Sequence, residues 1–190
     1  MIDPSTAALL VMDFQPGILG RLADPDGVVA RAAEAIDVVR GRGGHIGYVR
    51  VAFTDDDLER MPADSAMSAA LARAGGAPRA DDPATQIDDR LRPQDGDVVV
   101  RKTRVGAFST TDLERQLRER GVTTLVLAGI STSGVVLSTV RDAADRDYRL
   151  FVLSDACADP DADVHAFLVE RVFPRQAEVV AVDSVGRLIS

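Results

Sequence analysis

Short apolar runs alternate with amphipathic segments along most of the chain. Runs at residues 7–14, 45–51, 97–102, 124–128, 149–155 and 177–182 are typical of strands buried on both faces. Residues 28–40, 111–120, a segment ending near residue 145, and residues 161–172 are interpreted as helices. Candidate N-caps for the second helix are Ser109, Thr110 and Thr111. Such alternation predicts right-handed βαβ units and one parallel sheet covered on both faces, an α/β fold.

The stretch from residue 52 to residue 96 interrupts this pattern. It is rich in Asp, Pro, Ala and Arg, and its hydrophobic periodicity is weak. We expect a long excursion with one short helix near residues 65–74. A loop of this length in a compact domain usually contacts a ligand or a partner.

Composition excludes several classes of protein. The chain has 30 acidic and 22 basic residues, a net charge of −8, without a basic cluster, which argues against nucleic acid or an anionic membrane as partner. No apolar run is long enough to span a bilayer, so we expect a cytoplasmic protein with a small-molecule partner. Its one cysteine, Cys157, excludes an internal disulfide, and together with two histidines it excludes a four-ligand Cys/His zinc site.

Three predicted strands end in residues that carry chemistry: Asp13, Lys102 and the segment 129–135. Ligands of parallel sheets bind beyond the carboxyl ends of the strands, where these three places meet. Lys102 is the only lysine among the 22 basic residues, and lysine, unlike arginine, readily shifts its pKa when buried. An aspartate beside it would be oriented for proton transfer. The alternative interpretation of Asp13 is an aspartate that caps the loop after its strand, and that of Lys102 is an ordinary exposed lysine.

The glycine-rich segment 129–134, Gly-Ile-Ser-Thr-Ser-Gly, also suggests a serine nucleophile elbow. Its second glycine falls one residue later than in the G-x-S-x-G motif. The chain order Ser131, Asp155, His165 matches that of the serine α/β-hydrolases. His165 lies within an amphipathic segment, however, which favours a packed or solvated helix histidine. A serine-dependent hydrolase that uses Ser131 or Ser133 is therefore the less favoured alternative.

Several stretches of the chain together resemble the isochorismatase-like (cysteine hydrolase) superfamily. They are LLVMDFQPG, RKTRVGAFSTTDLERQL, LVLAGISTSGVVLSTVRDAADRDYRLFVLSDACAD and VFPRQAEVV. The resemblance covers nearly the whole chain. It implies one isochorismatase-like hydrolase domain over residues 1–190, with a three-layer α/β/α, Rossmann-like fold around a six-stranded, mainly parallel sheet. It also implies a homodimer or homotetramer.

The resemblance assigns catalytic roles to Asp13 and Lys102, but the third place of the family's Asp–Lys–Cys triad is occupied by Val135. Because valine cannot form an acyl-enzyme, a thiol amidase is not expected. The histidines of the nicotinamidase metal signature are also missing, so we expect neither metal nor cofactor. The resemblance further implies a cis peptide bond between Ile130 and Ser131, with the amides of Ser131 and Val135 forming an oxyanion hole.

The acid–base pair that remains resembles that of the isochorismatases proper, and this resemblance implies hydrolysis of a vinyl ether without a thiol nucleophile. Asp13 would protonate the enol-ether carbon, and water would capture the resulting oxocarbenium ion. The alternative is a catalytically inactive family member whose pocket is a binding or interaction surface. Cys157 lies at a different strand end and is not the expected nucleophile. Further side chains expected to bind substrate, from their places at strand ends, are Phe14, Gln15, Arg50, Phe108 and Thr132.

Overall fold

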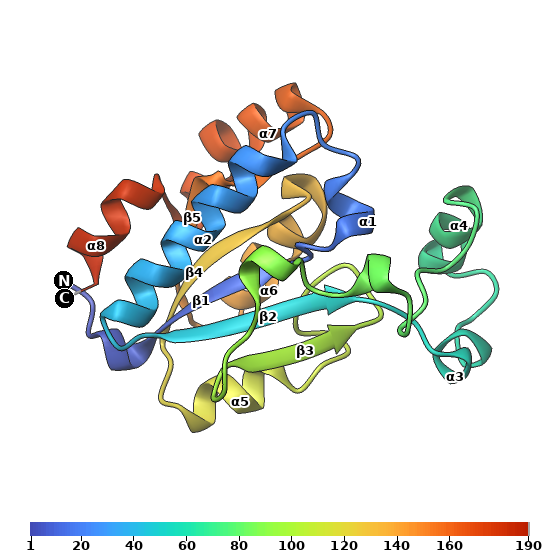
Figure 1. Cartoon of the computed structure of the whole chain (residues 1–190), viewed down its shortest axis with the longest axis horizontal. Helices are drawn as coiled ribbons and strands as arrows, with labels where there is room; N and C mark the ends of the chain where they lie inside the picture. The colour runs from blue at the N-terminus through green and yellow to red at the C-terminus, as the bar shows by residue number, and fades with distance from the viewer. Residues whose placement is uncertain (190) are drawn as a thin grey trace.

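A six-stranded, all-parallel sheet forms the centre of the computed structural model, which describes residues 1–189 (Figure 1). The strand order is β3-β2-β1-β4-β5-β6, which confirms the predicted α/β class. β5 is longer and β6 shorter than the sequence pattern predicts. The strands are β1 (Ala7–Met12), β2 (His45–Val51), β3 (Val98–Lys102), β4 (Thr124–Ile130), β5 (Arg149–Ala158) and β6 (Glu178–Val180).

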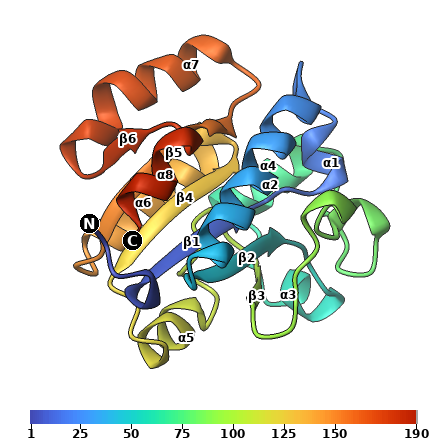
Figure 2. The same cartoon turned by 60° about the vertical axis from the view of Figure 1, so that its left-hand side comes forward.

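Helices cover both faces of this sheet (Figure 2). The α-helices are α1 (Pro16–Leu19), α2 (Pro25–Gly41), α3 (Asp55–Glu59), α4 (Ala66–Arg73), α5 (Leu113–Glu119), α6 (Leu137–Ala144), α7 (Ala162–Phe167) and α8 (Val185–Leu188). Shorter 3₁₀ turns are Pro4–Thr6, Pro83–Thr85, Asp89–Leu91, Phe173–Arg175 and Val182–Ser184, and π-helical turns are Thr132–Val136 and Leu168–Val172. No helix within residues 1–189 is both long enough and apolar enough to cross a membrane.

Alternate side chains of β1 enter two separate hydrophobic cores. Leu9 and Val11 pack on the side of the sheet covered by α2 and α8. Leu10 and Met12 pack on the opposite side, against α5 and α6. Because both faces of the strand are buried, β1 appears in the sequence as an uninterrupted apolar run. Its polar residues begin only where the strand leaves the sheet, at Asp13.

The segment from residue 52 to residue 96, here called the arm, contains more regular structure than expected. The helix predicted near residues 65–74 is confirmed as α4, but α3 and two 3₁₀ turns were not predicted. α3 begins with three aspartates, which by composition resemble a loop. A capping box between Thr54 and Asp57 stabilises its first turn, because each residue's side chain accepts a hydrogen bond from the other's backbone amide.

The predicted N-caps of the helix at residues 111–120 were wrong. α5 begins after Asp112, which holds the N-cap position. Thr110 instead accepts a hydrogen bond from the backbone amide of Thr103, 3.0 Å away. The hydroxyl of Thr111 donates to the carbonyl of Ala107 at 2.7 Å. Both threonines therefore stabilise the loop that leads from β3 to α5.

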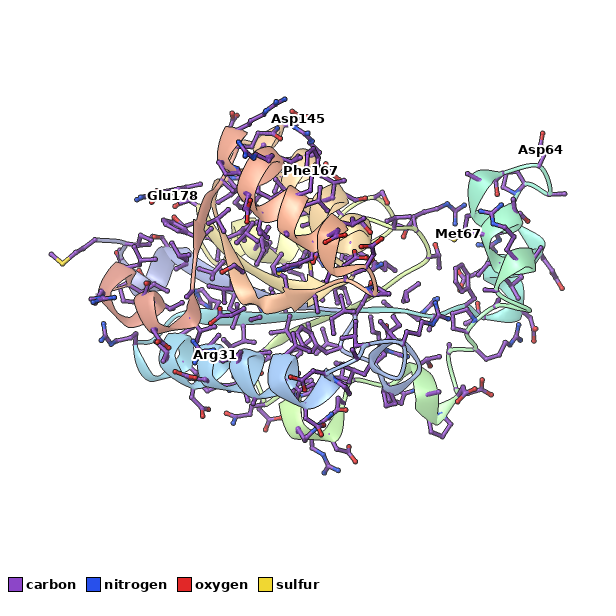
Figure 3. All side chains as sticks on the ribbon, turned by 90° about the horizontal axis from the view of Figure 1, so that it is seen from above. Arg31, Asp64, Met67, Asp145, Phe167 and Glu178 are labelled. Carbon is purple, nitrogen blue, oxygen red and sulfur yellow. The ribbon has the colours of Figure 1, made fainter. Side chains whose placement is uncertain are left out.

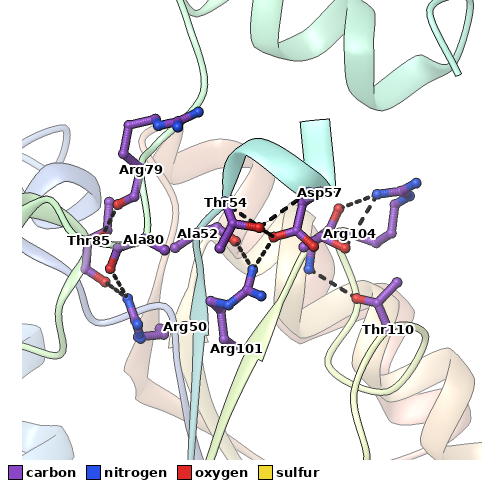
Figure 4. A network of polar contacts seen from close by, with 11 residues as sticks. Arg50, Ala52, Thr54, Asp57, Arg79, Ala80, Thr85, Arg101, Arg104 and Thr110 are labelled. Carbon is purple, nitrogen blue, oxygen red and sulfur yellow. Dashed lines mark hydrogen bonds and ion pairs between the residues drawn. The ribbon is translucent and has the colours of Figure 1, made fainter. Parts of the chain in front are cut away.

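Polar side chains fasten the arm to the ends of β2 and β3 (Figure 4). The Arg101 guanidinium donates to the Ala52 carbonyl at 2.9 Å and to the Asp57 carboxylate at 2.5 Å. Hydrogen bonds from the Thr54 amide, together with Arg101, lower the pKa of Asp57 to about 2. Arg50 donates to the carbonyl of Thr85 at 3.1 Å, near the other end of the arm. These contacts hold the arm beside the carboxyl edge of the sheet.

Candidate active site

The ends of β1 and β3 bring Asp13 and Lys102 into a buried ion pair. Asp13 Oδ2 lies 2.8 Å from Lys102 Nζ, and the two side chains are 6% and 2% exposed. The Asp13 backbone has a φ of 61°, a left-handed conformation that residues other than glycine seldom adopt. Its amide still donates to the Val49 carbonyl of β2, 2.8 Å away. The aspartate is thus held at the point where the chain turns away from the sheet.

The Lys102 ammonium is held by three acceptors. Besides Asp13, it donates to the carbonyls of Arg104 at 3.1 Å and Val105 at 2.9 Å. An ammonium has three N–H donors, so each has a protein partner here. The lysine therefore supplies a fixed positive charge beside the Asp13 carboxyl group.

Burial raises the pKa of Asp13 to about 6, although the Lys102 charge and hydrogen bond act in the opposite direction. The second carboxylate oxygen, Oδ1, is buried and has no hydrogen-bond partner within residues 1–189. Desolvation disfavours the charged carboxylate, whereas the neighbouring ammonium favours it. A carboxyl group with this pKa is populated in both protonation states near neutral pH, so it is suited to donate and accept a proton.

The segment after β4 supplies the third side of the site. The peptide bond between Ile130 and Ser131 is cis, as predicted, and the chain then enters the π-helical turn Thr132–Val136. Gly134 leaves room for Ser131, because a Cβ atom on this glycine would lie 2.7 Å from Ser131 Oγ. Val135 is buried, with 2% of its surface exposed. The valine therefore presents an unreactive side chain on this side of the site.

These three strand ends surround a cavity of about 240 Å³. It brings together Asp13, Lys102, Ile130, Ser131 and Val135, which were all named from the sequence. Gly134, within the segment 129–135 marked in the sequence, also lines the cavity. Sequence reasoning missed the other lining residues, which come from α1 and the loop after it, the end of β2, α4, and the loops after β3 and β5. Of these, Arg104 stands two places after Lys102 and had a positional signal. The missed residues are Ile18, Arg21, Val51, Met67, Arg104, Val105 and Pro160.

Three apolar or small side chains expected to bind substrate lie outside this lining. Phe14 is buried in the core beneath α2. Phe108 packs against Tyr148, with 6.1 Å between the ring centroids. Thr132 is fully buried, and its hydroxyl lies 2.8 Å from Nδ1 of His165. Each stands near a strand end, but its side chain points into the protein.

Arg50 and Gln15 also have protein partners. Arg50 donates to carbonyls of the arm and is not part of this cavity's lining. The Gln15 amide donates to the carbonyls of Val51 at 2.9 Å and Thr85 at 2.6 Å, and its oxygen accepts from the Val51 amide at 2.8 Å. Gln15 therefore joins the ends of β1 and β2 to the arm and acts as a structural clamp.

The residues of the alternative serine triad are not assembled. Asp155 pairs with Arg31, at 2.8 Å between Oδ2 and Nε, and also accepts from a backbone amide. His165 contacts Thr132 instead of either serine. The Ser133 hydroxyl donates to Asp159 at 2.6 Å. No serine in this segment therefore has a histidine base.

Cys157 has the properties of a structural thiol. It is buried, and its sulfur lies 3.6 Å from the Leu127 carbonyl. Burial raises its pKa to about 12, so the nucleophilic thiolate is scarce near neutral pH. Within residues 1–189, no three His, Cys, Asp or Glu side chains are grouped so that they could hold a metal ion.

Comparison with known proteins identifies the family. The isochorismatase domain matches residues 7–184. The isochorismatase family protein YecD of Escherichia coli O157:H7 is 34% identical over 189 residues, covering 97% of this chain and 96% of its own. Ureidoacrylate amidohydrolase RutB of Methylobacterium radiotolerans is 34% identical over 210 residues, covering 96% and 80%. The structure of an isochorismatase family protein from Burkholderia thailandensis matches with a TM-score of 0.83 at 32% identity, covering 98% and 96%. The chain therefore belongs to the isochorismatase family, whose members are hydrolases.

Proposed function

We propose that this protein, as one isochorismatase-like hydrolase domain over residues 1–190, hydrolyses a small-molecule vinyl ether by acid–base catalysis through Asp13 and Lys102. The observation that carries this proposal is the buried Asp13–Lys102 ion pair in the wall of a cavity that Val135 also lines. A vinyl ether requires a proton donor and water but no covalent nucleophile. The reaction therefore uses the Asp13–Lys102 pair and needs no thiol nucleophile.

The proposed reaction begins with Asp13 in its acid form. Its proton is transferred to the terminal carbon of the enol ether, whose π electron pair forms the new C–H bond. The positive charge that develops on the neighbouring carbon is shared with the ether oxygen. Water then adds to this carbon and returns a proton to Asp13, giving a hemiketal. Cleavage of its C–O bond releases a ketone and an alcohol, so the net reaction consumes one water molecule.

Lys102 stabilises the Asp13 carboxylate once the proton has left. Because two backbone carbonyls hold the ammonium in place, it needs no rearrangement when the negative charge appears. We assign the backbone amides of Ser131 and Val135 to an oxygen atom of the substrate. These donors belong to the main chain, so the valine side chain does not remove them.

Two arginines in the cavity wall point to a substrate that carries a carboxylate. Neither Arg21 nor Arg104 has an acidic partner among residues 1–189, and Arg104 donates only to the neighbouring Thr103. Asp13 and Lys102 neutralise each other, so the arginines leave the cavity positively charged in a protein with a net charge of −8. Guanidinium groups recognise carboxylates through charge-assisted hydrogen bonds. A 2-alkoxyacrylate, which combines a vinyl ether with a carboxylate, is therefore a suitable probe.

Arg104→Gln is expected to raise the KM for a 2-alkoxyacrylate by about 10- to 100-fold, the range of one hydrogen bond to a charged group. The kcat is expected to change only a few-fold, because the proton donor is intact. Steady-state kinetics on the acid and on its neutral methyl ester measure the effect. Arg60→Gln, in an exposed pair with Asp56, is the control. An equal KM increase for acid and ester would contradict recognition of the carboxylate.

The pH dependence of kcat/KM tests the proposed function directly. Burial raises the pKa of Asp13 to about 6. The protonated carboxyl group that the reaction requires therefore predominates below this pH and is lost as the pH rises above it. We expect kcat/KM on a 2-alkoxyacrylate to fall about tenfold per pH unit above about pH 6. Enzyme-free hydrolysis must be subtracted, because acid alone cleaves vinyl ethers. A rate that instead rises with pH through this range would indicate a base or nucleophile and contradict the proposal.

Val135 favours a second candidate function, a family member that binds such a ligand without turnover. This candidate predicts calorimetric binding of the 2-alkoxyacrylate with no product formed at any pH.

A further inference from the structure

A second cavity of about 530 Å³ adjoins the cavity that contains Asp13 and Lys102. The two cavities share four lining residues, Ile18, Arg21, Val51 and Met67. The reactive cavity alone, about 240 Å³, is smaller than the roughly 300–1,000 Å³ of most small-molecule sites. Joined through their shared wall, the two cavities fall within that range. We call the second one the α4 chamber, because α4 forms one side of it.

The α4 chamber is lined mainly by apolar atoms. Ala70 and Leu71 of α4 face it from one side, and Phe53 and Pro78 of the arm contribute further apolar surface. Its charged residues are Arg21, at the junction with the reactive cavity, and Asp82. The Asp82 side chain already accepts a hydrogen bond from the Ala84 amide at 2.7 Å. The chamber therefore offers apolar contact area to a ligand, and among residues 1–189 it contains no polar group that needs a ligand as its hydrogen-bond partner.

The walls of the α4 chamber come from two parts of one chain. Gly17 and Ile18 of α1 line it together with α4, and the arm that carries α4 is fastened by Arg101 and Arg50. Figure 3 shows Met67 on the side of α4 that faces the rest of the molecule. The α4 chamber therefore lies beneath α4 and is continuous with the reactive cavity. This continuity favours a small molecule as its occupant.

We propose that the α4 chamber binds an apolar substituent of the substrate, and that Ala70, Leu71 and Met67 determine substrate length. The substrate is then an elongated molecule. Its vinyl ether lies at Asp13, its carboxylate lies near Arg104 and Arg21, of which Arg21 is at the junction, and its apolar end lies beneath α4. This inference rests on the proposed function for the position of the reacting group, but the binding of the apolar end is tested without turnover.

The test is calorimetric titration with linear carboxylates, from butanoate to octanoate, and with the uncharged 1-alkanols of the same lengths. For the wild type, we expect the affinity to rise about fourfold for each added CH₂ group that enters the chamber. Ala70→Phe fills the chamber and is expected to abolish this increase while butanoate still binds. Ala69→Phe is the matched control, since Ala69 is an exposed neighbour on α4 that lines neither cavity.

The outcomes separate this inference from the proposed function. If the wild type binds butanoate but its affinity does not rise for longer carboxylates, the proposed role of the α4 chamber is overturned and the carboxylate site remains supported. Failure of all carboxylates, with alkanols still showing a length dependence that Ala70→Phe removes, would overturn the carboxylate site and support the chamber. If light scattering shows a changed oligomeric state for Ala70→Phe while the ligand affinities are unchanged, the chamber is an interface between copies of the chain. This result would overturn its proposed role in substrate binding.

Discussion

Asp13→Asn is expected to lower kcat/KM on a 2-alkoxyacrylate by about a thousandfold, within the range usual for loss of a general acid. Asparagine has nearly the shape of aspartic acid, but its amide cannot transfer a proton to carbon. The remaining cavity, with Arg21 and Arg104, still binds the substrate. We therefore expect the loss in kcat, with KM changed only a few-fold. Steady-state kinetics, with calorimetric titration of the unreacted substrate, measure the two effects separately.

Val135→Cys is the companion variant to Asp13→Asn. Because valine takes no part in the proposed reaction, the thiol is expected to leave vinyl-ether turnover within a few-fold of the wild type. Amide hydrolysis that appears only in Val135→Cys, with no vinyl-ether turnover by the wild type, would identify an enzyme that has lost its thiol. Full activity of Asp13→Asn, with labelling by a fluorophosphonate, would instead support the serine-dependent reaction. Either result contradicts the role assigned to Asp13.

The core of the site is predictable from sequence because it depends on strand ends alone. Asp13 directly follows the buried strand β1, and Lys102 ends the edge strand β3. In a parallel sheet the carboxyl ends of the strands lie at one edge. The pattern does not reveal where a side chain at that edge points. Phe14 and Gln15 follow Asp13 directly, yet one lies in the core and the other binds backbone groups.

The remaining part of the site depends on contacts between distant segments. Met67 reaches the cavity because the arm carries α4 to the carboxyl edge of the sheet. That position is fixed by pairs such as Arg101 with Asp57, which are 44 residues apart in the chain. Hydrophobic periodicity describes local structure, and the arm has little of it. Its place over the site therefore follows from tertiary contacts that no local pattern encodes.

Lys102→Met is expected to lower the free energy of unfolding by about 3–5 kcal/mol at a pH well above the Asp13 pKa, the usual cost of leaving one charge of a buried pair without its partner. Methionine fills a similar volume, so the effect reports mainly on charge. Without the lysine, the native pKa of Asp13 rises further above its ordinary value of 3.8. The native state then binds the proton more tightly than the unfolded chain does, so stability falls as pH rises from about 4 through that raised pKa.

Urea denaturation at about pH 5 and about pH 8 is expected to show the larger loss at the higher pH. Arg60→Met is the control, since Arg60 and Asp56 form a pair that is 78% and 61% exposed and contributes about 0–1 kcal/mol. Equal losses at both pH values would mean that Lys102 acts through packing. The double variant Asp13→Asn, Lys102→Met removes both buried charges and is expected to recover most of the lost stability. That recovery would mean that two neutral side chains serve the fold about as well, so the stability of the domain would not explain this ion pair, whereas the proposed proton transfer at Asp13 would.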